Sequence, residues 1–270
     1  MVHMRLNSKN SFLLGYAFVM LIFWAGMYAS GIKLLTINKV WGIGINFLPL
    51  FGGIFGLYTS RYWGGFKSAV GKGIILIALG LISWSLGNWI WSYYNFFLAS
   101  DIPYPSWADA GYIAAVPLWA AGMFYLSKAT GAKFALRNVI GKLYLIFLPL
   151  VTLAASYYLL VSVARGGSIT AGGGMGKVFF DFAYPLGDVV IVTLALLILG
   201  LSSKYLGGRY RWPVLVTIFG FLTMFFADFS FSYTTTLGSY YDGHPNNLLF
   251  VAALGAIGFG ISSFDTKEVE

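Results

Sequence analysis

Long apolar runs alternate with short polar segments along the whole chain, and each run is close to the length needed to cross a bilayer. Spanning requires about 20 predominantly apolar residues. Eight segments meet this condition, approximately residues 12–32, 40–60, 73–98, 108–127, 143–163, 178–201, 213–237 and 247–264. The eighth is the shortest. The pattern predicts an all-α, polytopic transmembrane helix bundle that forms a single integral membrane domain over residues 1–270.

Composition and charge agree with a multi-pass protein of the cell membrane. The chain is 59% hydrophobic and only 10% charged, whereas soluble domains average about 25% charged residues. Of its Lys and Arg residues, 13 fall at the termini or in the even-numbered loops and 4 in the odd-numbered loops. The positive-inside rule then places both termini in the cytoplasm. Because this rule already explains the juxtamembrane basic residues, we expect no nucleic acid partner.

The third and seventh apolar segments end in similar sequences, which indicates an internal repeat. The stretches NWIWSYYNFFLASDIPYP and DFSFSYTTTLGSYYDGHP align without a gap, pairing Asn88 with Asp228, Ser92 with Ser232, Tyr93 with Tyr233 and Pro105 with Pro245. The chain therefore reads as four hairpins, and repeats of this kind often place a site at their interface. The alternative is convergent enrichment of Trp and Tyr at the outer membrane interface.

Four aspartates lie within the predicted spans, and all four fall from the midplane outward: Asp109, Asp181, Asp188 and Asp228. A carboxylate in hydrocarbon is costly unless it is paired, protonated or exposed to a wet cavity. Helical spacing places Asp181, Tyr184 and Asp188 on one stripe. Because Pro185 lacks an N–H, we expect it to break this helix and free a carbonyl beside the acids.

The polar stripes predict one outward-facing acidic and aromatic cavity. Carboxylates beside aromatic rings suit a cation or an amphipathic molecule. The alternatives are that each Asp is interhelical glue and that each aromatic residue is an interfacial anchor. The candidate ligand-binding residues are Asn88, Trp89, Asp109, Tyr112, Asp181, Tyr184, Asp188 and Asp228.

The chain carries no recognisable catalytic or cofactor motif. It has no cysteine, and its two histidines, His3 and His244, lie outside the predicted spans. This argues against a Ser–His–Asp arrangement, thiolate sites and bis-histidine haem. We therefore expect neither an enzyme nor a metal site, and the sequence identifies no cofactor.

Three short motifs resemble those of the polytopic N-terminal sensor regions that precede diguanylate-cyclase or histidine-kinase modules in prokaryotic signalling proteins. The first is Pro-Ser-x-Ala-Asp-x-x-Tyr, the second Asp-x-x-Tyr-Pro-x-Gly-Asp and the third Ala-Asp. They correspond here to Pro105, Ser106, Ala108, Asp109 and Tyr112, to Asp181, Tyr184, Pro185, Gly187 and Asp188, and to Ala227 and Asp228. The resemblance implies an eight-helix signal-input or binding module.

The sequence departs from that family in ending at Glu270, a few residues past the eighth segment. We therefore expect a sensor that acts through a partner, either another membrane protein or a second copy. One alternative is a transporter or channel for a cation or small solute, although the apolar inner half favours the sensor. The other is a structural subunit of a larger membrane complex.

Overall fold

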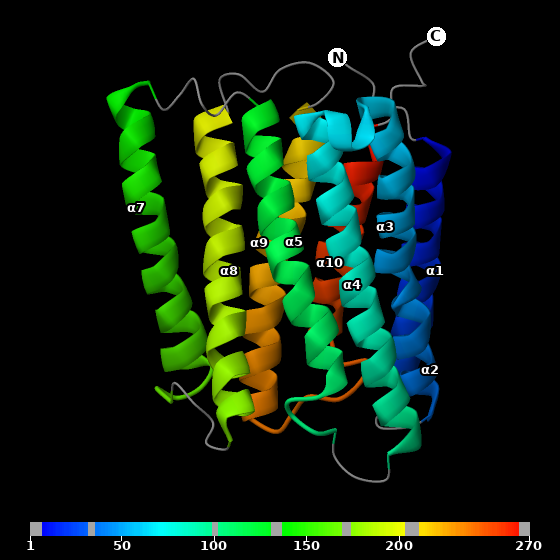
Figure 1. Ribbon diagram of the computed structural model, residues 1–270. Helices are drawn as coiled ribbons and strands as arrows, with labels where there is room; N and C mark the ends of the chain where they lie inside the picture. Colours follow the sequence, from blue (N-terminus) through cyan, green and yellow to red (C-terminus); the bar gives the residue numbers. More distant parts are fainter. Residues whose placement is uncertain are drawn as a thin grey trace.

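The computed structural model describes residues 7–31, 36–98, 102–130, 137–168, 174–202 and 211–264, and within these ranges it is a bundle of helices without strands (Figure 1). Seven crossings are long and apolar enough to span a membrane, and the eighth is a shorter apolar helix. The predicted all-α polytopic fold is confirmed. The helices are α1 (Ser8–Ala29), α2 (Thr36–Ile45), α3 (Phe47–Ser60), α4 (Ala69–Phe97), α5 (Trp107–Ala129), α7 (Val139–Ser156), α8 (Met175–Ser202), α9 (Arg211–Thr236) and α10 (Asn247–Ser262), with a π-helical segment, η3 (Tyr157–Val163), extending α7.

The start of α1 and the end of α10 lie together at one end of the bundle. The Asn7 side-chain amide donates to the Ser262 carbonyl at 3.1 Å, and the Asn10 amide donates to the Ser263 hydroxyl at 2.6 Å. We call this the terminal end and the opposite one the cavity end. Lys9 and the 3-10 turns Arg61–Trp63 and Gly65–Lys67 also belong to the terminal end. The charge distribution predicts that this end is cytoplasmic.

The second crossing is broken, and the sixth is not. The predicted span 40–60 consists of α2 and α3, which meet at Asn46. Pro49 has no N–H to donate to the Ile45 carbonyl, which weakens the helix here. The Asn46 carbonyl instead accepts a hydrogen bond from the Ser85 hydroxyl at 2.8 Å. By contrast, α8 runs continuously through Pro185, so the predicted break there is wrong.

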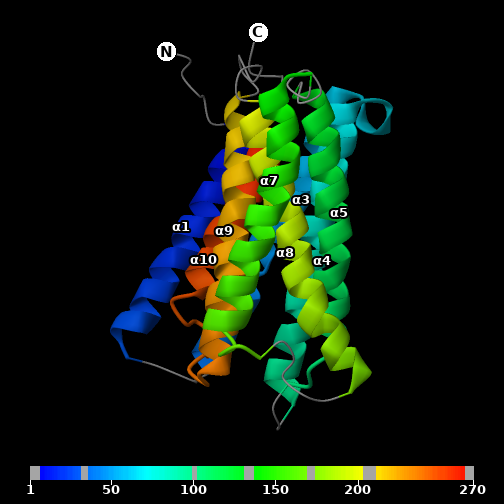
Figure 2. The same cartoon turned by 90° about the vertical axis from the view of Figure 1, so that its left-hand side faces the viewer.

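Glycines let the central helices approach backbone to backbone. A Cβ atom at Gly111 on α5 would lie 2.6 Å from the Gly87 nitrogen on α4, and one at Gly52 on α3 would lie 2.8 Å from the Gly258 Cα on α10. Small residues commonly support such close crossings in membranes. In contrast, α1 and α7 stand at opposite edges of the bundle (Figures 1 and 2).

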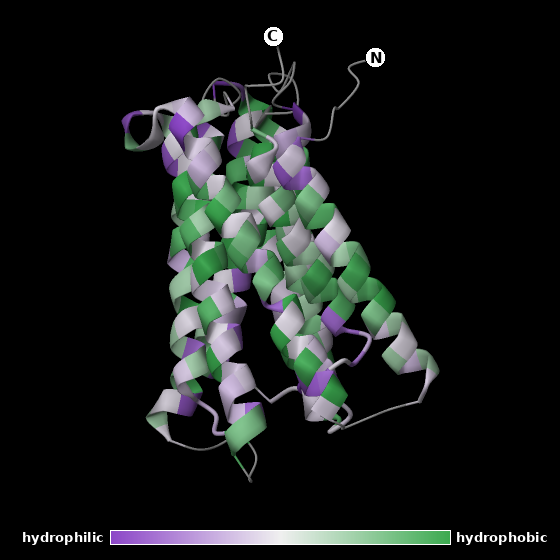
Figure 3. Cartoon of the chain, turned by 90° about the vertical axis from the view of Figure 1, so that its right-hand side faces the viewer, coloured by the Kyte–Doolittle hydropathy of each residue, from purple (hydrophilic) through white to green (hydrophobic). Residues whose placement is uncertain are grey.

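A hydrophobic core fills the terminal half. Its fully buried members include Ile74, Ile77, Met123, Ile198 and Ile257, contributed by α4, α5, α8 and α10. Figure 3 shows hydrophobic residues dominating the middle of the bundle and hydrophilic ones toward both of its ends. The core therefore closes the bundle on the terminal side of the site.

The hairpin of α4 and α5 is repeated by the hairpin of α9 and α10. A Cβ atom at Gly122 would meet the Gly73 carbonyl and the Ile77 nitrogen, each at 3.0 Å. A Cβ atom at Gly260 would meet the corresponding atoms of Pro213 and Thr217 at 3.0 and 2.8 Å. The residues of α4 and α9 are thus related by a shift of 140 positions, whereas those of α5 and α10 are related by a shift of 138.

This packing extends the sequence repeat and corrects one part of it. Asn88 and Asp228 keep their pairing because they lie on the first helix of each hairpin. The ungapped pairing does not continue into the second helix of each hairpin, because the shift between the repeats changes by two residues from α4 to α5. The shift of 138 places Asn247 at the position of Asp109.

Candidate functional site

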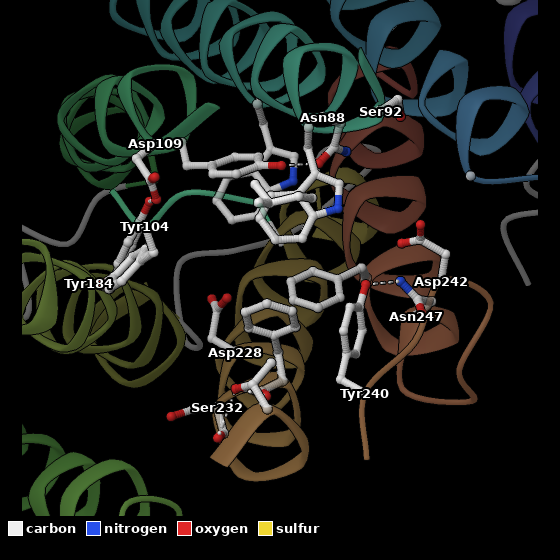
Figure 4. Close-up of a pocket in the computed structure, with 18 of the residues that line it drawn as sticks. Asn88, Ser92, Tyr104, Asp109, Tyr184, Asp228, Ser232, Tyr240, Asp242 and Asn247 are labelled. Carbon is white, nitrogen blue, oxygen red and sulfur yellow. Dashed lines mark hydrogen bonds between the residues drawn. The ribbon is translucent and has the colours of Figure 1, made fainter. Parts of the chain in front are cut away.

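A cavity of about 710 Å³ lies in the half of the bundle opposite the termini. Its walls come from α2, α3, α4, α5, α8, α9 and α10, and residues of the connecting segments at the cavity end, including Tyr104 and Asp242, contribute to its rim. Figure 4 shows side chains from several helices pointing into this common space. All four aspartates singled out by sequence line it: Asp109, Asp181, Asp188 and Asp228.

Asp109 connects the start of α5 to α8. One of its carboxyl oxygens accepts hydrogen bonds from the Ser106 backbone N–H at 2.6 Å and the Ser106 hydroxyl at 3.2 Å. These contacts form a capping box, which satisfies N–H groups that a helix start leaves unpaired. The other oxygen accepts from the Tyr184 hydroxyl at 2.6 Å (Figure 4). Asp109 is only 6% exposed, so much of its role is to fix this corner of the cavity.

Asp181 is held by a tyrosine and an arginine. Its carboxyl accepts from the Tyr104 hydroxyl at 3.1 Å and lies 3.9 Å from the Arg165 guanidinium. The guanidinium also donates to the Asp181 backbone carbonyl at 3.1 Å. That carbonyl is free because its helical partner would be the missing N–H of Pro185. The expected free carbonyl is therefore present, and Arg165 uses it without any break in the helix.

Asp188 of α8 and Asp228 of α9 are hydrogen-bonded to each other. A hydrogen bond between two carboxyl groups requires a proton on one of them, because two adjacent carboxylates repel each other. The pair therefore holds at least one proton. Both residues line the cavity.

Aromatic rings form the wall beside these acids. Tyr112 donates to the Asn88 side-chain oxygen at 2.9 Å, and its ring centroid lies 4.7 Å from that of Trp84. On the α9 and α10 side, the Phe231 ring lies 4.8 Å from Tyr240 and 6.2 Å from Phe250. The cavity thus combines an acidic pair with an extensive aromatic surface.

Trp89 lies outside this wall, contrary to its selection as a candidate binding residue. It is 41% exposed, and its ring packs edge-on against Phe47 at 4.9 Å. Trp91 lines the cavity instead. Trp91 is three positions after Asn88, which places both on one face of α4. Trp89 is the next residue after Asn88 and is turned about 100° away from it.

Sequence reasoning missed a second polar cluster at the rim, centred on Asp242. Its carboxyl accepts from the Asn95 side-chain amide at 2.6 Å and from Trp91. Lys39 lies nearby and donates to the Asn95 carbonyl. Burial raises the pKa of Asp242, although Trp91, Lys39 and Asn95 oppose this shift. The sequence did show an acid before Pro245, but it contained nothing to indicate that a loop residue would face the cavity.

The three motifs of the sequence contact one another in space. The first is joined to the second through Asp109 and Tyr184, and the second to the third through Asp188 and Asp228. The described part of the chain brings no three His, Asp or Glu side chains into a metal-binding arrangement. Comparison of the chain with protein-family models, curated proteins and solved structures gives no match.

Proposed function

We propose that this polytopic membrane protein is a non-enzymatic binding module of the sensor type, which takes up a small ligand from the side opposite its termini and acts through a partner. The observation that carries this proposal is the cavity of about 710 Å³ at one end of a bundle whose other end is packed. Ligand sites commonly have volumes of about 300–1,000 Å³ and combine apolar walls with a few polar groups. Here the aromatic wall and the acids supply both.

The position of the cavity favours binding over transport. A transport path needs access from both sides, and transporter sites typically lie at the midplane between two moving halves. In this bundle the terminal half is occupied by fully buried side chains such as Leu81, Trp119, Met123 and Phe221. Gly80 packs against the Trp119 ring with no room for a Cβ atom. An opening toward the termini would have to separate these close contacts.

The motif resemblance supports a role in signal input, and the surface suggests where a partner could bind. The turns that join α3 to α4 present Phe66, which is 66% exposed, beside Arg61 and Lys67. Lys128, Arg137 and Lys142 lie at the same end, and residues 131–136 between them fall outside the described ranges. A contact at this end could transmit a change in α4 or α5 to another protein.

Gentle extraction from the native membrane followed by native mass spectrometry tests the proposal. We expect the particle to carry a small molecule and a second protein or a second copy. The variant Ser232→Trp should lose the small molecule, because Ser232 lines the cavity. Phe226→Trp, on the exposed side of the same helix, should retain it. A lone monomer that conducts ions after reconstitution into liposomes would favour the transporter and overturn the proposal.

A further inference from the structure

The two halves of the bundle have the same arrangement of helices. In the first half, α3 packs against its neighbour α4 and also against α10. In the second, α8 packs against its neighbour α9 and also against α5. Because α4 and α5 correspond to α9 and α10, the helix that corresponds to α3 is α8. The halves are thus parallel repeats about an axis along the bundle, as in several transporter folds, and the cavity lies between them.

This repeat contains an internal comparison for the acidic pair. In the first half, the Asn46 side-chain amide of the second crossing donates to the Asn88 carbonyl of α4 at 3.2 Å. In the second half, Asp188 of α8 is hydrogen-bonded to Asp228 of α9. The first half therefore joins the equivalent helices through one side-chain amide and a backbone carbonyl. These helices of the first half are joined without a carboxyl pair, which argues against simple interhelical glue as the reason for one in the second half.

The acids at the rim have basic side chains as neighbours. Asp188 and Asp228, in contrast, have each other as partners. Asp181 lies beside Arg165, and the positive charge of Lys39 opposes the rise in the pKa of Asp242. For Asp188 and Asp228, the described part of the chain provides no such basic neighbour. Both carboxyl groups line the cavity and are available to something that enters it.

We propose that the cavity binds an organic monocation, with its ammonium group on Asp188 and Asp228 and its apolar body on the aromatic wall. This inference rests on the proposed function and adds the chemical class of the ligand. A positive charge beside a carboxyl group favours the ionised form of that group, so an ammonium group would stabilise a carboxylate here. Aromatic rings attract ammonium groups through their faces, and Phe231, Tyr240 and Phe250 line the same space. The Asn247 side-chain oxygen, which is shielded from solvent and has no hydrogen-bond partner, is a further acceptor for an N–H group.

Three probes of similar size separate charge from shape: 2-phenylethylamine as a cation, 2-phenylethanol as a neutral analogue and phenylacetate as an anion. Their binding to the full chain in detergent micelles can be measured by isothermal titration calorimetry. We expect the amine to bind at least about tenfold more tightly than the other two, since a hydrogen bond to a charged group contributes about 1.5–3 kcal/mol and each 1.4 kcal/mol is tenfold. Equal binding of amine and alcohol overturns the proposal.

The double variant Asp188→Asn/Asp228→Asn replaces both carboxyl groups with neutral amides of similar size. It should fold, lose at least about tenfold in amine affinity and leave the alcohol unaffected. Failure to fold would refute the internal comparison, and unchanged amine affinity would refute the binding role. Phe231→Leu should weaken the amine about threefold or more while sparing the alcohol. Phe226→Leu, on the exposed side of the same helix as Phe231 and outside the cavity, is the matched control.

The outcome also separates this inference from the proposed function. If none of the probes binds but native particles carry a molecule that Ser232→Trp removes, the binding module stands and the cationic class is wrong. If neither probes nor a native molecule occupy the cavity, both proposals fail.

Discussion

The hydrogen bond from the Tyr184 hydroxyl to Asp109 ties α8 to the start of α5, and its contribution to stability can be predicted from its geometry. The contact is short, at 2.6 Å, and Asp109 is 6% exposed. The other Asp109 oxygen caps α5 through Ser106. Removing the tyrosine hydroxyl therefore tests the interhelical bond alone, whereas removing the carboxyl tests the bond and the cap together.

Interhelical hydrogen bonds in membrane proteins average about 0.6 kcal/mol and reach about 1.7 kcal/mol. The short distance and the burial place this one near the upper limit, so Tyr184→Phe should lower the free energy of unfolding by about 1.5 kcal/mol. Loss of a helix cap costs about 1 kcal/mol more, which gives about 2.5 kcal/mol for Asp109→Ala. The double variant should lose no more than Asp109→Ala, because the bond is already absent.

A double-mutant cycle measures the coupling directly. Unfolding in mixed dodecyl maltoside and SDS micelles, followed by circular dichroism, gives the four free energies. We expect a coupling of about 1.5 kcal/mol. The control pairs Asp109→Ala with Tyr16→Phe, because the Tyr16 hydroxyl donates to the Gly44 carbonyl on another part of the bundle, and its coupling should be near zero. A coupling for Tyr184 no larger than the control refutes the assigned contact.

Three further predictions follow from other parts of the molecule. Gly111→Ala should destabilise the protein by about 1–3 kcal/mol through overpacking against Gly87. Gly15 has open space around it, so Gly15→Ala should stabilise α1 by about 0.5–1 kcal/mol. The same unfolding assay compares the two variants. Because burial raises the pKa of Asp242, the folded state holds that proton more tightly, and stability falls as pH rises from about 4 through the raised value. Asp242→Asn should therefore gain stability over the wild type at neutral pH in thermal unfolding, and the difference should vanish near pH 4. A reporter active only outside the cell should stay silent when fused to Glu270, and strong activity there contradicts the topology.

Hydropathy predicted the number, order and approximate bounds of the crossings because each crossing must satisfy its backbone within one apolar helix. It did not predict which helix would break. Both Pro49 and Pro185 remove a helical hydrogen bond, yet only the helix near Pro49 is interrupted. The difference lies in tertiary contacts: Ser85 binds the backbone at Asn46, whereas Arg165 binds the carbonyl freed by Pro185 while α8 continues. Those contacts join residues far apart in the sequence.

Depth and helical spacing were enough to group the four aspartates around one cavity, because both quantities depend only on position along a helix. They did not determine the partner of each acid, since that depends on how neighbouring helices are rotated. The same limit explains Trp89 and Asp242. Trp89 directly follows Asn88 in the sequence, but adjacent residues face different directions on a helix. Asp242 lies in a connecting segment, where periodicity gives no direction.

The structure gives the three motifs a physical meaning that does not depend on any ligand. Asp109 and Tyr184 fix α5 against α8, and Asp188 and Asp228 fix α8 against α9. The spacing of these residues within the second motif, three and then four positions apart, lets a single face of α8 hold both neighbours. The first contact also caps a helix and is explained by stability. In the other half of the bundle, the equivalent helices are joined by an amide and a backbone carbonyl. Stability alone therefore does not explain two carboxyl groups, and this difference makes the Asp188–Asp228 pair the part of the cavity where function should be sought.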